Sequence, residues 1–208
     1  MTGIVRRIIK PCLILMARRL AVAALWLAPV FSLLAGDDLP EVVRTNYYQV
    51  TGHSTDALLS AMRAQRPFSQ NAYTEWFINW QYEFQTRSNE WGLRSFAARL
   101  KVTYTLPQWT DEATAPTALR AEWERYLAAT RRHEAGHAEI GRAAAKAMLK
   151  LAGTTNWQTA TKAALGPRVD ADCEKILKEF RARETAYDNQ TDHGRTQGAR
   201  LGPASVKR

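Results

Sequence analysis

The stretch RRHEAGHAEIG, Arg131 to Gly141, holds two histidines four residues apart and a glutamate directly after the first. Residues four apart lie one above the other on one face of an α-helix, so His133 and His137 would point to a common position. Zinc accepts neutral imidazole nitrogens as ligands, and in the HExxH pattern the glutamate serves as general base. The stretch therefore predicts a zinc site carried by a helix, with Glu134 beside the ion. The alternative is a pair of buried histidines that are hydrogen-bonded to their neighbours.

The residues around this stretch favour a long helix. Residues 117–151 contain no proline and are rich in alanine, leucine, glutamate, lysine and arginine, which are good helix formers. Apolar positions recur at steps of three and four once the two histidines are counted in the stripe. These positions are Leu119, Trp123, Tyr126, Thr130, Ile140, Ala144, Ala147 and Leu151. His133 and His137 are therefore expected to face the interior, where buried polar groups need partners.

Strand-like segments precede this helix. Alternating apolar and polar residues predict strands at 45–52, 73–84 and 95–107, with a short helix at 54–67. After 117–151 we expect a break at 153–155, a short helix to 165, a break at Gly166–Pro167 and a helix to about 187. Strands first and helices afterwards indicate the α+β class. The expected fold is a small N-terminal antiparallel sheet of about three strands plus a short helix, packed on long C-terminal helices, one of which carries HExxH.

The first 35 residues have the pattern of a secretory signal peptide. They carry five basic and no acidic residues, and an apolar run from Leu20 to Leu34 precedes a polar start. The run is shorter than the roughly 20 residues of a membrane span, although an uncleaved anchor is the alternative. Because Met16 begins a compact signal by itself, residues 1–15 are expected to be an extension of the gene model. The mature chain is expected to start between Leu33 and Asp37 and to be periplasmic or secreted.

The charge of the mature chain does not favour nucleic acid as a partner. Removing the five basic residues of the leader lowers the net charge from +9 to +4. We expect a single zincin-like metalloprotease domain at 36–193 and a disordered tail at 194–208, which is Gly-, Arg- and Ser-containing without a period. Of the two cysteines, Cys12 leaves with the leader, so Cys173 is expected to be a buried small hydrophobe rather than half of an internal disulfide.

Five motifs together resemble one protein family. They are YYQVTG, a tryptophan-rich strand, YTLPQW, RHEAGHAEI and, at 187–194, YDNQTDHG. The chain is similar, from about Tyr47 to Gly194, to the bacterial domain-of-unknown-function family nine-two-two, whose members are described as predicted secreted or periplasmic zinc-dependent proteases. The resemblance implies zinc binding by His133 and His137 and catalysis by Glu134. It also implies a second functional cluster made of Tyr187, Asp188, Thr191 and His193. The protease label of the family is itself an inference from HExxH.

A catalytic zinc site needs a third protein ligand, which HExxH does not supply. The third histidine of the extended HExxHxxGxxH pattern is absent, because Ala143 occupies its position. If the chain reverses near residue 153 and returns antiparallel, residues around 169 come level with His137. This reversal favours Asp170 or Glu174 as the ligand.

The other candidates follow the last helix. Asp188 and His193 lie where the chain end can fold over the site. We expect His193 to be the third ligand and Asp188 to accept a ring N–H from one of the histidines. Asp188, Asp170 and Glu174 remain alternatives. In the alternative without a metal role, Asp188 and Thr191 cap a turn and His193 lies on the surface.

Together with the leader and the resemblance to the bacterial family, these residues predict zinc-dependent hydrolysis of peptide bonds in the bacterial cell envelope. Glu134 would take a proton from a zinc-bound water, and Tyr187 is a candidate donor to the oxyanion. A peptide or protein substrate is expected to lie extended along a sheet edge, although the pattern does not say which edge. The alternatives are a non-catalytic, zinc-stabilised envelope binding module and a metal-dependent amidase acting on cell-wall peptides.

Overall fold

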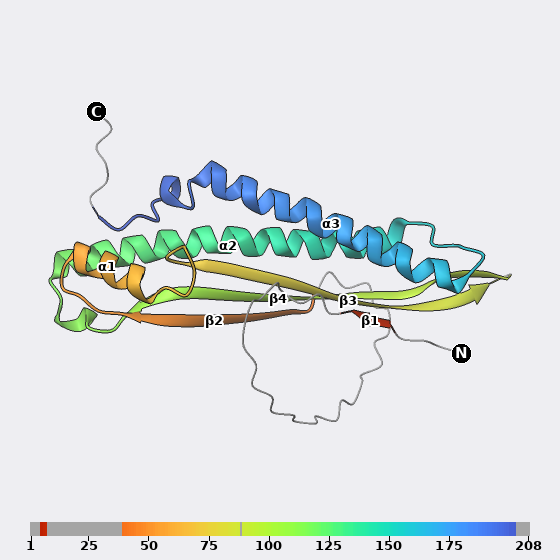
Figure 1. The fold of residues 1–208 in the computed structure, drawn as a ribbon, viewed down its shortest axis with the longest axis horizontal. Coiled ribbons are helices and arrows are strands. Elements are labelled where there is room, and N and C mark those ends of the chain that lie inside the picture. The colour runs from red at the N-terminus through yellow and green to blue at the C-terminus, as the bar shows by residue number, and fades with distance from the viewer. Residues whose placement is uncertain (1–4, 8–38, 88, 203–208) are drawn as a thin grey trace, which may run out of the picture.

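The computed structural model describes residues 5–7, 39–87 and 89–202. A long, narrow sheet lies under two long helices that run along it (Figure 1). The elements are β1 (Val5–Arg7), β2 (Glu41–Val50), α1 (Thr55–Gln65), β3 (Tyr73–Arg87), β4 (Glu90–Trp109), η1 (Glu112–Thr114), α2 (Thr117–Thr154), α3 (Lys162–Thr191) and η2 (Arg195–Gln197). From residue 39 onward, strands and one short helix thus precede the long helices, and the expected α+β class is confirmed.

The sheet is mixed rather than antiparallel. Its strand order is β1-β3-β4-β2, and β3 and β4 form an antiparallel hairpin. β2 pairs parallel to β4, with Glu41 opposite Leu100 and Val50 opposite Trp109, which corrects the predicted antiparallel sheet. The reason is the connection through α1, which carries the chain from β2 to β3 and leaves a strand position between them that β4 fills. Alternation predicts a strand but does not name its neighbour.

A piece of the predicted leader lies at one edge of the sheet. Val5–Arg7 pairs antiparallel with Trp80–Tyr82 of β3. The rest of the predicted leader, including the whole of the expected cleavage region, lies outside the described residues, so cleavage stays a prediction. Among the helices of the described segments, none is long and apolar enough to cross a membrane.

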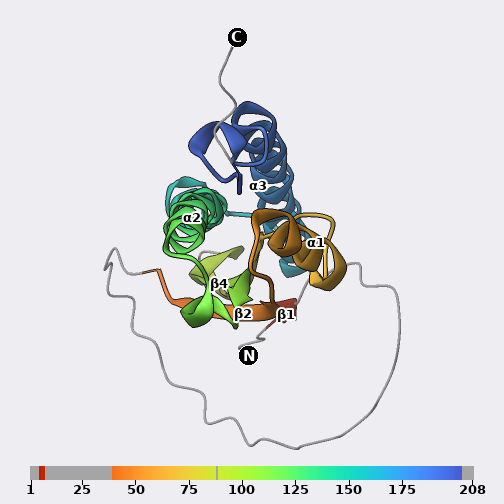
Figure 2. The same cartoon turned by 90° about the vertical axis from the view of Figure 1, so that its left-hand side faces the viewer.

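The core lies between the sheet and the helices (Figure 2). Trp76, Ile78 and Trp80 alternate along β3 and are all buried on the helical face of the sheet. α2 buries most of the predicted stripe, including both histidines of HExxH. α2 lies close to β3 at Gly141, where a Cβ atom would lie 2.7 Å from Cγ of Trp76. This contact holds α2 against β3 and brings the start of β3 next to HExxH.

α3 is one continuous helix, which corrects the predicted break at Gly166–Pro167. Pro167 lies in its second turn. Leu165 and Val169, on either side of the proline, are fully buried, so packing offsets the hydrogen bond that proline cannot make. The connection that precedes α3 is tied to the hairpin, because Trp91 and Thr159 exchange two backbone hydrogen bonds of 2.8 and 2.9 Å.

The segment after α3 is packed as far as residue 202, unlike the disordered tail predicted for 194–208. Leu201 is buried in a cluster with Trp123 and Tyr126 of α2, and the Gly202 N–H donates to Glu122. Turns at Gly194, Gly198 and Gly202 have positive φ and fold the segment back along α2. Residues 194–202 show neither a helical nor a strand period, so the sequence alone does not indicate that they pack against α2. Residues 203–208 lie outside the described part.

Candidate metal centre

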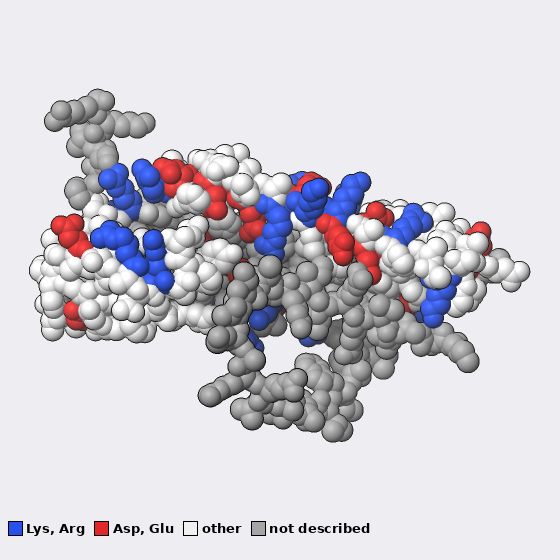
Figure 3. All heavy atoms as spheres, in the orientation of Figure 1, with Lys and Arg blue, Asp and Glu red and all other residues white. Residues whose placement is uncertain are grey.

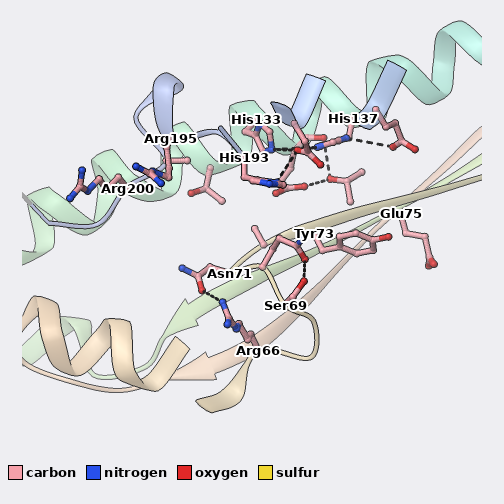
Figure 4. A pocket seen from close by; sticks show the side chains of 18 of the residues that line it. Arg66, Ser69, Asn71, Tyr73, Glu75, His133, His137, His193, Arg195 and Arg200 are labelled. Atoms are coloured by element: carbon pink, nitrogen blue, oxygen red, sulfur yellow. Dashed lines mark hydrogen bonds and ion pairs between the residues drawn. The ribbon is translucent and has the colours of Figure 1, made fainter. Parts of the chain in front are cut away.

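Three donor atoms from two helices converge beside HExxH. The Nε2 atoms of His133 and His137, on α2, are 3.3 Å apart. Oδ1 of Asp188, near the end of α3, is 3.2 Å from Nε2 of His133 and 3.0 Å from Nε2 of His137. Figure 4 shows the two histidines side by side on α2. We call His133, His137 and Asp188 the metal triad.

The other ring nitrogens decide the protonation of the histidines. Nδ1 of His133 faces Oε1 of Gln197 at 3.1 Å, and Nδ1 of His137 faces the Glu184 carboxylate at 3.5 Å. Because both neighbours are acceptors, each Nδ1 carries a hydrogen in the neutral ring and each Nε2 presents a lone pair. When both rings are neutral, two lone pairs and a carboxylate oxygen therefore point to one position. A bound cation satisfies all three.

The spacing of the triad suits a small metal ion. Ligand atoms about 2.05 Å from a tetrahedral zinc are about 3.3 Å from each other. The three distances in the triad, 3.0, 3.2 and 3.3 Å, are close to this value. Within the described residues, His133, His137 and Asp188 are the group of side chains placed to hold a metal ion.

The arrangement favours Asp188 over His193 as the third ligand. Nδ1 of His193 is 3.6 Å from Oδ1 of Asp188, and 55% of its side chain is exposed. Asp192 and His193 have φ of 49° and 51°, so the backbone turns at the end of α3 and leaves His193 at the rim of the site. The sequence predicts that Asp188 accepts a ring N–H of a histidine. Gln197 accepts from His133 and Glu184 from His137 in its stead.

The two carboxylates of the other candidate set lie elsewhere on α3. Oδ1 of Asp170 accepts a 3.1 Å hydrogen bond from Nε1 of Trp80 and is buried in the core. Asp170 and Glu174 belong neither to the metal triad nor to the lining of the cavity beside it. The last turns of α3, rather than the residues around 169, lie level with His137.

Glu134 faces the same cavity as the triad. Its Oε2 accepts a 2.6 Å hydrogen bond from the Thr74 hydroxyl at the start of β3, and the same hydroxyl lies 3.1 Å from the Glu134 carbonyl oxygen. The Glu134 side chain is buried, and burial raises its pKa above the usual range although Thr74 and His137 act in the opposite direction. Its carboxylate is thus a stronger base than a solvent-exposed one.

The YDNQTDHG segment encloses His133. The Tyr187 ring stacks on the His133 ring at 5.0 Å between centroids, and the Tyr187 hydroxyl donates to the His133 carbonyl. A Cβ atom at Gly136 would overlap the Tyr187 hydroxyl, which explains the glycine inside HEAGH. Gly194, at φ 80°, also packs closely on the His133 ring, where a Cβ atom would lie 2.8 Å from Cγ. The Tyr187 hydroxyl is hydrogen-bonded to the His133 backbone, and Tyr187 does not line the cavity. Tyr187 therefore positions His133, and the structure does not support it as a donor to the oxyanion.

Two polar neighbours of the triad were missed at the level of sequence. Gln197 lies in the segment predicted to be disordered. Glu184 precedes Asp188 by four residues, and this spacing places both carboxylates on one face of a helix. Oε1 of Glu184 also accepts a 2.7 Å hydrogen bond from Nε1 of Trp76, and its Oε2 pairs with Arg181 at 2.6 Å. Burial alone would raise the Glu184 pKa, but the hydrogen bonds from His137, Arg181 and Trp76 lower it below its ordinary value.

Replacing Glu184 by glutamine is expected to weaken metal binding about 10–100-fold without abolishing it, because the His137 ring loses its charged partner but keeps its place. Competition with a chromophoric chelator measures the affinity. Glu179→Gln is the matched control, since Glu179 is exposed on the same helix and pairs with Arg183. An affinity equal to that of the unaltered protein would show that Glu184 does not support His137.

The triad opens into a cavity of about 1160 Å³. One wall is the start of β3, from which Tyr73, Thr74, Glu75 and Phe77 contribute, and the opposite wall comes from α2 and the end of α3. Figure 4 shows Tyr73 and Glu75 on the β3 side of the space below the histidines. The site therefore adjoins the edge of the sheet.

Comparison with known proteins identifies a family but no function. Residues 45–194 match the family model described as "Bacterial protein of unknown function (DUF922)". No curated protein and no solved structure matches the chain. The match runs from within β2 to the turn at Gly194 and so contains the whole triad, Glu134 and the YDNQTDHG segment. The chain belongs to this bacterial family of unknown function, DUF922.

Proposed function

We propose that this protein is a zinc-dependent peptidase of the bacterial cell envelope, periplasmic or secreted. The observation that carries the proposal is the placement of a buried carboxylate, Glu134, on the same cavity as a three-residue ligand group. Catalytic zinc sites have three protein ligands and keep a position for water or substrate, whereas structural sites have four. A closed structural site would have no use for Glu134.

Zinc supplies two things when it is bound in such a site: it lowers the pKa of water towards about 7 and it polarises a carbonyl. Glu134 takes the proton of the attacking water and then passes it to the leaving amine. The 2.6 Å hydrogen bond from Thr74 orients the Glu134 carboxylate. Burial raises the Glu134 pKa towards the working pH, which improves a general base.

The substrate is proposed to lie along the edge of β3. One edge of the sheet is β2, which contributes no residue to the cavity. At the other edge, the start of β3 lines the cavity. One side of β3 is paired with β4, and on the other side β1 covers only Trp80–Tyr82 within the described residues. An extended peptide added antiparallel beside Tyr73–Phe77 would pass the triad and Glu134. β1 itself is antiparallel to β3 at this edge.

The proposal is tested by incubating the purified chain with denatured proteins and with cell-wall fragments, with and without chelator. We expect new protein fragments by mass spectrometry only without chelator, and their return when zinc is restored. Cleavage confined to cell-wall peptides would instead identify an amidase. Stoichiometric zinc without cleavage of either would identify a non-catalytic module.

A further inference from the structure

β3 and α2 run in the same direction along the cavity. Thr74 of β3 contacts Glu134 of α2, and Trp76 of β3 contacts Gly141 of α2. Both elements therefore run the same way past the site. Residues that precede Thr74 and residues that precede Glu134 lie together at one end of the cavity, which also receives the segment after α3.

This end carries positive charge. Arg66 comes from the end of α1, and Arg195 and Arg200 from the segment after α3; we call the part of the cavity lined by these three the basic end. Figure 4 shows Arg66 on one side of the space and Arg195 and Arg200 on the other. Figure 3 shows Lys and Arg side chains along this face, including its α1 end.

The acidic residues of the cavity lie away from the basic end. Asp188 belongs to the metal triad, Glu134 and Glu184 lie beside the triad, and Glu75 follows Thr74 along β3. Arg195 pairs with Asp192 at 3.3 Å in an exposed contact. Arg66 donates to the neutral Asn71 Oδ1 at 3.2 Å, and no ion pair of Arg66 occurs in the part of the chain that the structure describes.

A buried hydroxyl adds to the polar character of this end. Thr130 lies one turn before Glu134 on α2, is 4% exposed and lines the cavity. Besides the Tyr126 hydroxyl, with which it interacts, its Oγ1 has no hydrogen-bond partner within the described residues. A hydroxyl that lines a cavity can also bind a water or a ligand. The basic end thus offers a cation and a neutral donor to an anionic group.

The direction of the proposed substrate then decides which part of it meets the basic end. A peptide antiparallel to β3 runs opposite to α2, so its C-terminal part extends from the triad towards Thr130. At about 1.5 Å per helical residue, Thr130 is about 7 Å and Tyr126 about 13 Å along α2 from the triad. At about 3.3 Å per residue of extended peptide, these distances correspond to about two and about four residues.

We propose that the basic end binds a carboxylate on the C-terminal side of the scissile bond, two to four residues beyond it. The carboxylate is that of an aspartate or glutamate side chain, or the terminal α-carboxylate of a short peptide. This inference rests on the proposed function for the direction of the chain, but carboxylate binding can be measured without any cleavage.

The test uses zinc-loaded Glu134→Gln protein and fluorescein-labelled alanine–leucine octapeptides. The peptides carry Asp, Asn or Lys two residues from the C-terminus, each with a free and an amidated end, and dissociation constants come from fluorescence anisotropy. Either added carboxylate is expected to tighten binding about tenfold over the amidated Asn peptide. The free and amidated ends distinguish the terminal carboxylate from a side chain. The preference should shrink between 0.05 and 0.5 M salt, because mobile ions screen the charge.

Variants of Arg66 decide whether the basic end causes the preference. In the same background, Arg66→Gln should lose most of it and Arg66→Lys should keep it, which separates charge from an effect on the connection to β3. Arg63→Gln is the matched control, since Arg63 is exposed on the last turn of α1 and does not line the cavity. An equal preference in Arg66→Gln would overturn the proposal.

Two further outcomes separate this inference from the proposed function. Asp placed at the N-terminal end of the octapeptide should give no gain, and an equal gain there would overturn the antiparallel direction. The unaltered protein is tested in parallel for cleavage of all the peptides. A carboxylate preference in binding without any cleavage would refute the peptidase while keeping the basic end as a binding site. If the peptides were cleaved but neither cleavage nor binding depended on their charge, the carboxylate site at the basic end would be refuted and the peptidase would stand.

Discussion

Replacing Glu134 by glutamine is expected to leave the metal content unchanged and to lower the rate of peptide hydrolysis about 10²–10⁴-fold, the usual contribution of a general base. Glutamine has the same shape and its carbonyl oxygen still accepts the hydrogen bond from Thr74. It has no basic carboxylate to take a proton from water. Turnover of a peptide from the substrate screen, together with metal analysis of the same sample, measures both halves of the prediction.

Glu139→Gln is the control for this variant. Glu139 lies on the same helix, is mostly exposed and pairs with Arg142, so its loss should change neither turnover nor metal content. A Glu134→Gln protein without metal would assign Glu134 to ligation. Full turnover in a metal-loaded Glu134→Gln protein would remove Glu134 from catalysis.

Replacing Asp188 by alanine is expected to abolish stoichiometric metal binding. The carboxylate oxygen lies within 3.2 Å of both Nε2 atoms, and its removal leaves only two ligands on α2. His193→Ala should bind metal within about tenfold of the unaltered protein, because His193 is exposed and its side chain contacts the triad through Asp188, at 3.6 Å. Competition with a chelator gives the affinities, and circular dichroism shows whether each variant is folded.

The opposite ranking would restore the three-histidine site expected from the sequence. Metal lost in His193→Ala and retained in Asp188→Ala would mean that His193 turns inward when metal binds. His137→Ala serves as the positive control and should lose the metal in either case. Metal retained in that variant would remove the site from α2 altogether.

The local part of the site could be predicted because helical periodicity contains its geometry. A spacing of four residues brings His133 and His137 together on any α-helix, and the stripe through Trp123 and Ala144 shows which way they face. Alternation of apolar and polar residues likewise identified the strands of the hairpin. The resemblance to the family, rather than any periodicity, marked the YDNQTDHG segment as part of the site.

The third ligand could not be predicted because it depends on the offset between two helices. His137 lies 17 residues before Thr154, the end of α2, whereas Asp188 lies 26 residues after Lys162, the start of α3. The hairpin extends beyond the end of α2, and the connection bonded to Trp91 follows it outward, so α3 starts farther along (Figure 1). A simple reversal near residue 153 brings Asp170 level with His137 instead. No local pattern records this offset.

The Asp188–His137 contact also has a mechanical consequence, since it joins residues 51 positions apart. A metal ion held there is a removable cross-link in a chain whose described part contains one cysteine, buried and free. Closing a loop of this length by a covalent bond contributes about 4 kcal/mol in the chain-entropy model. The ion would therefore fasten the last turns of α3, and with them the wall that carries Arg195 and Arg200. Without the ion, the last turns of α3 would lose this cross-link, so removal of the metal is expected to lower the stability of this end of the molecule.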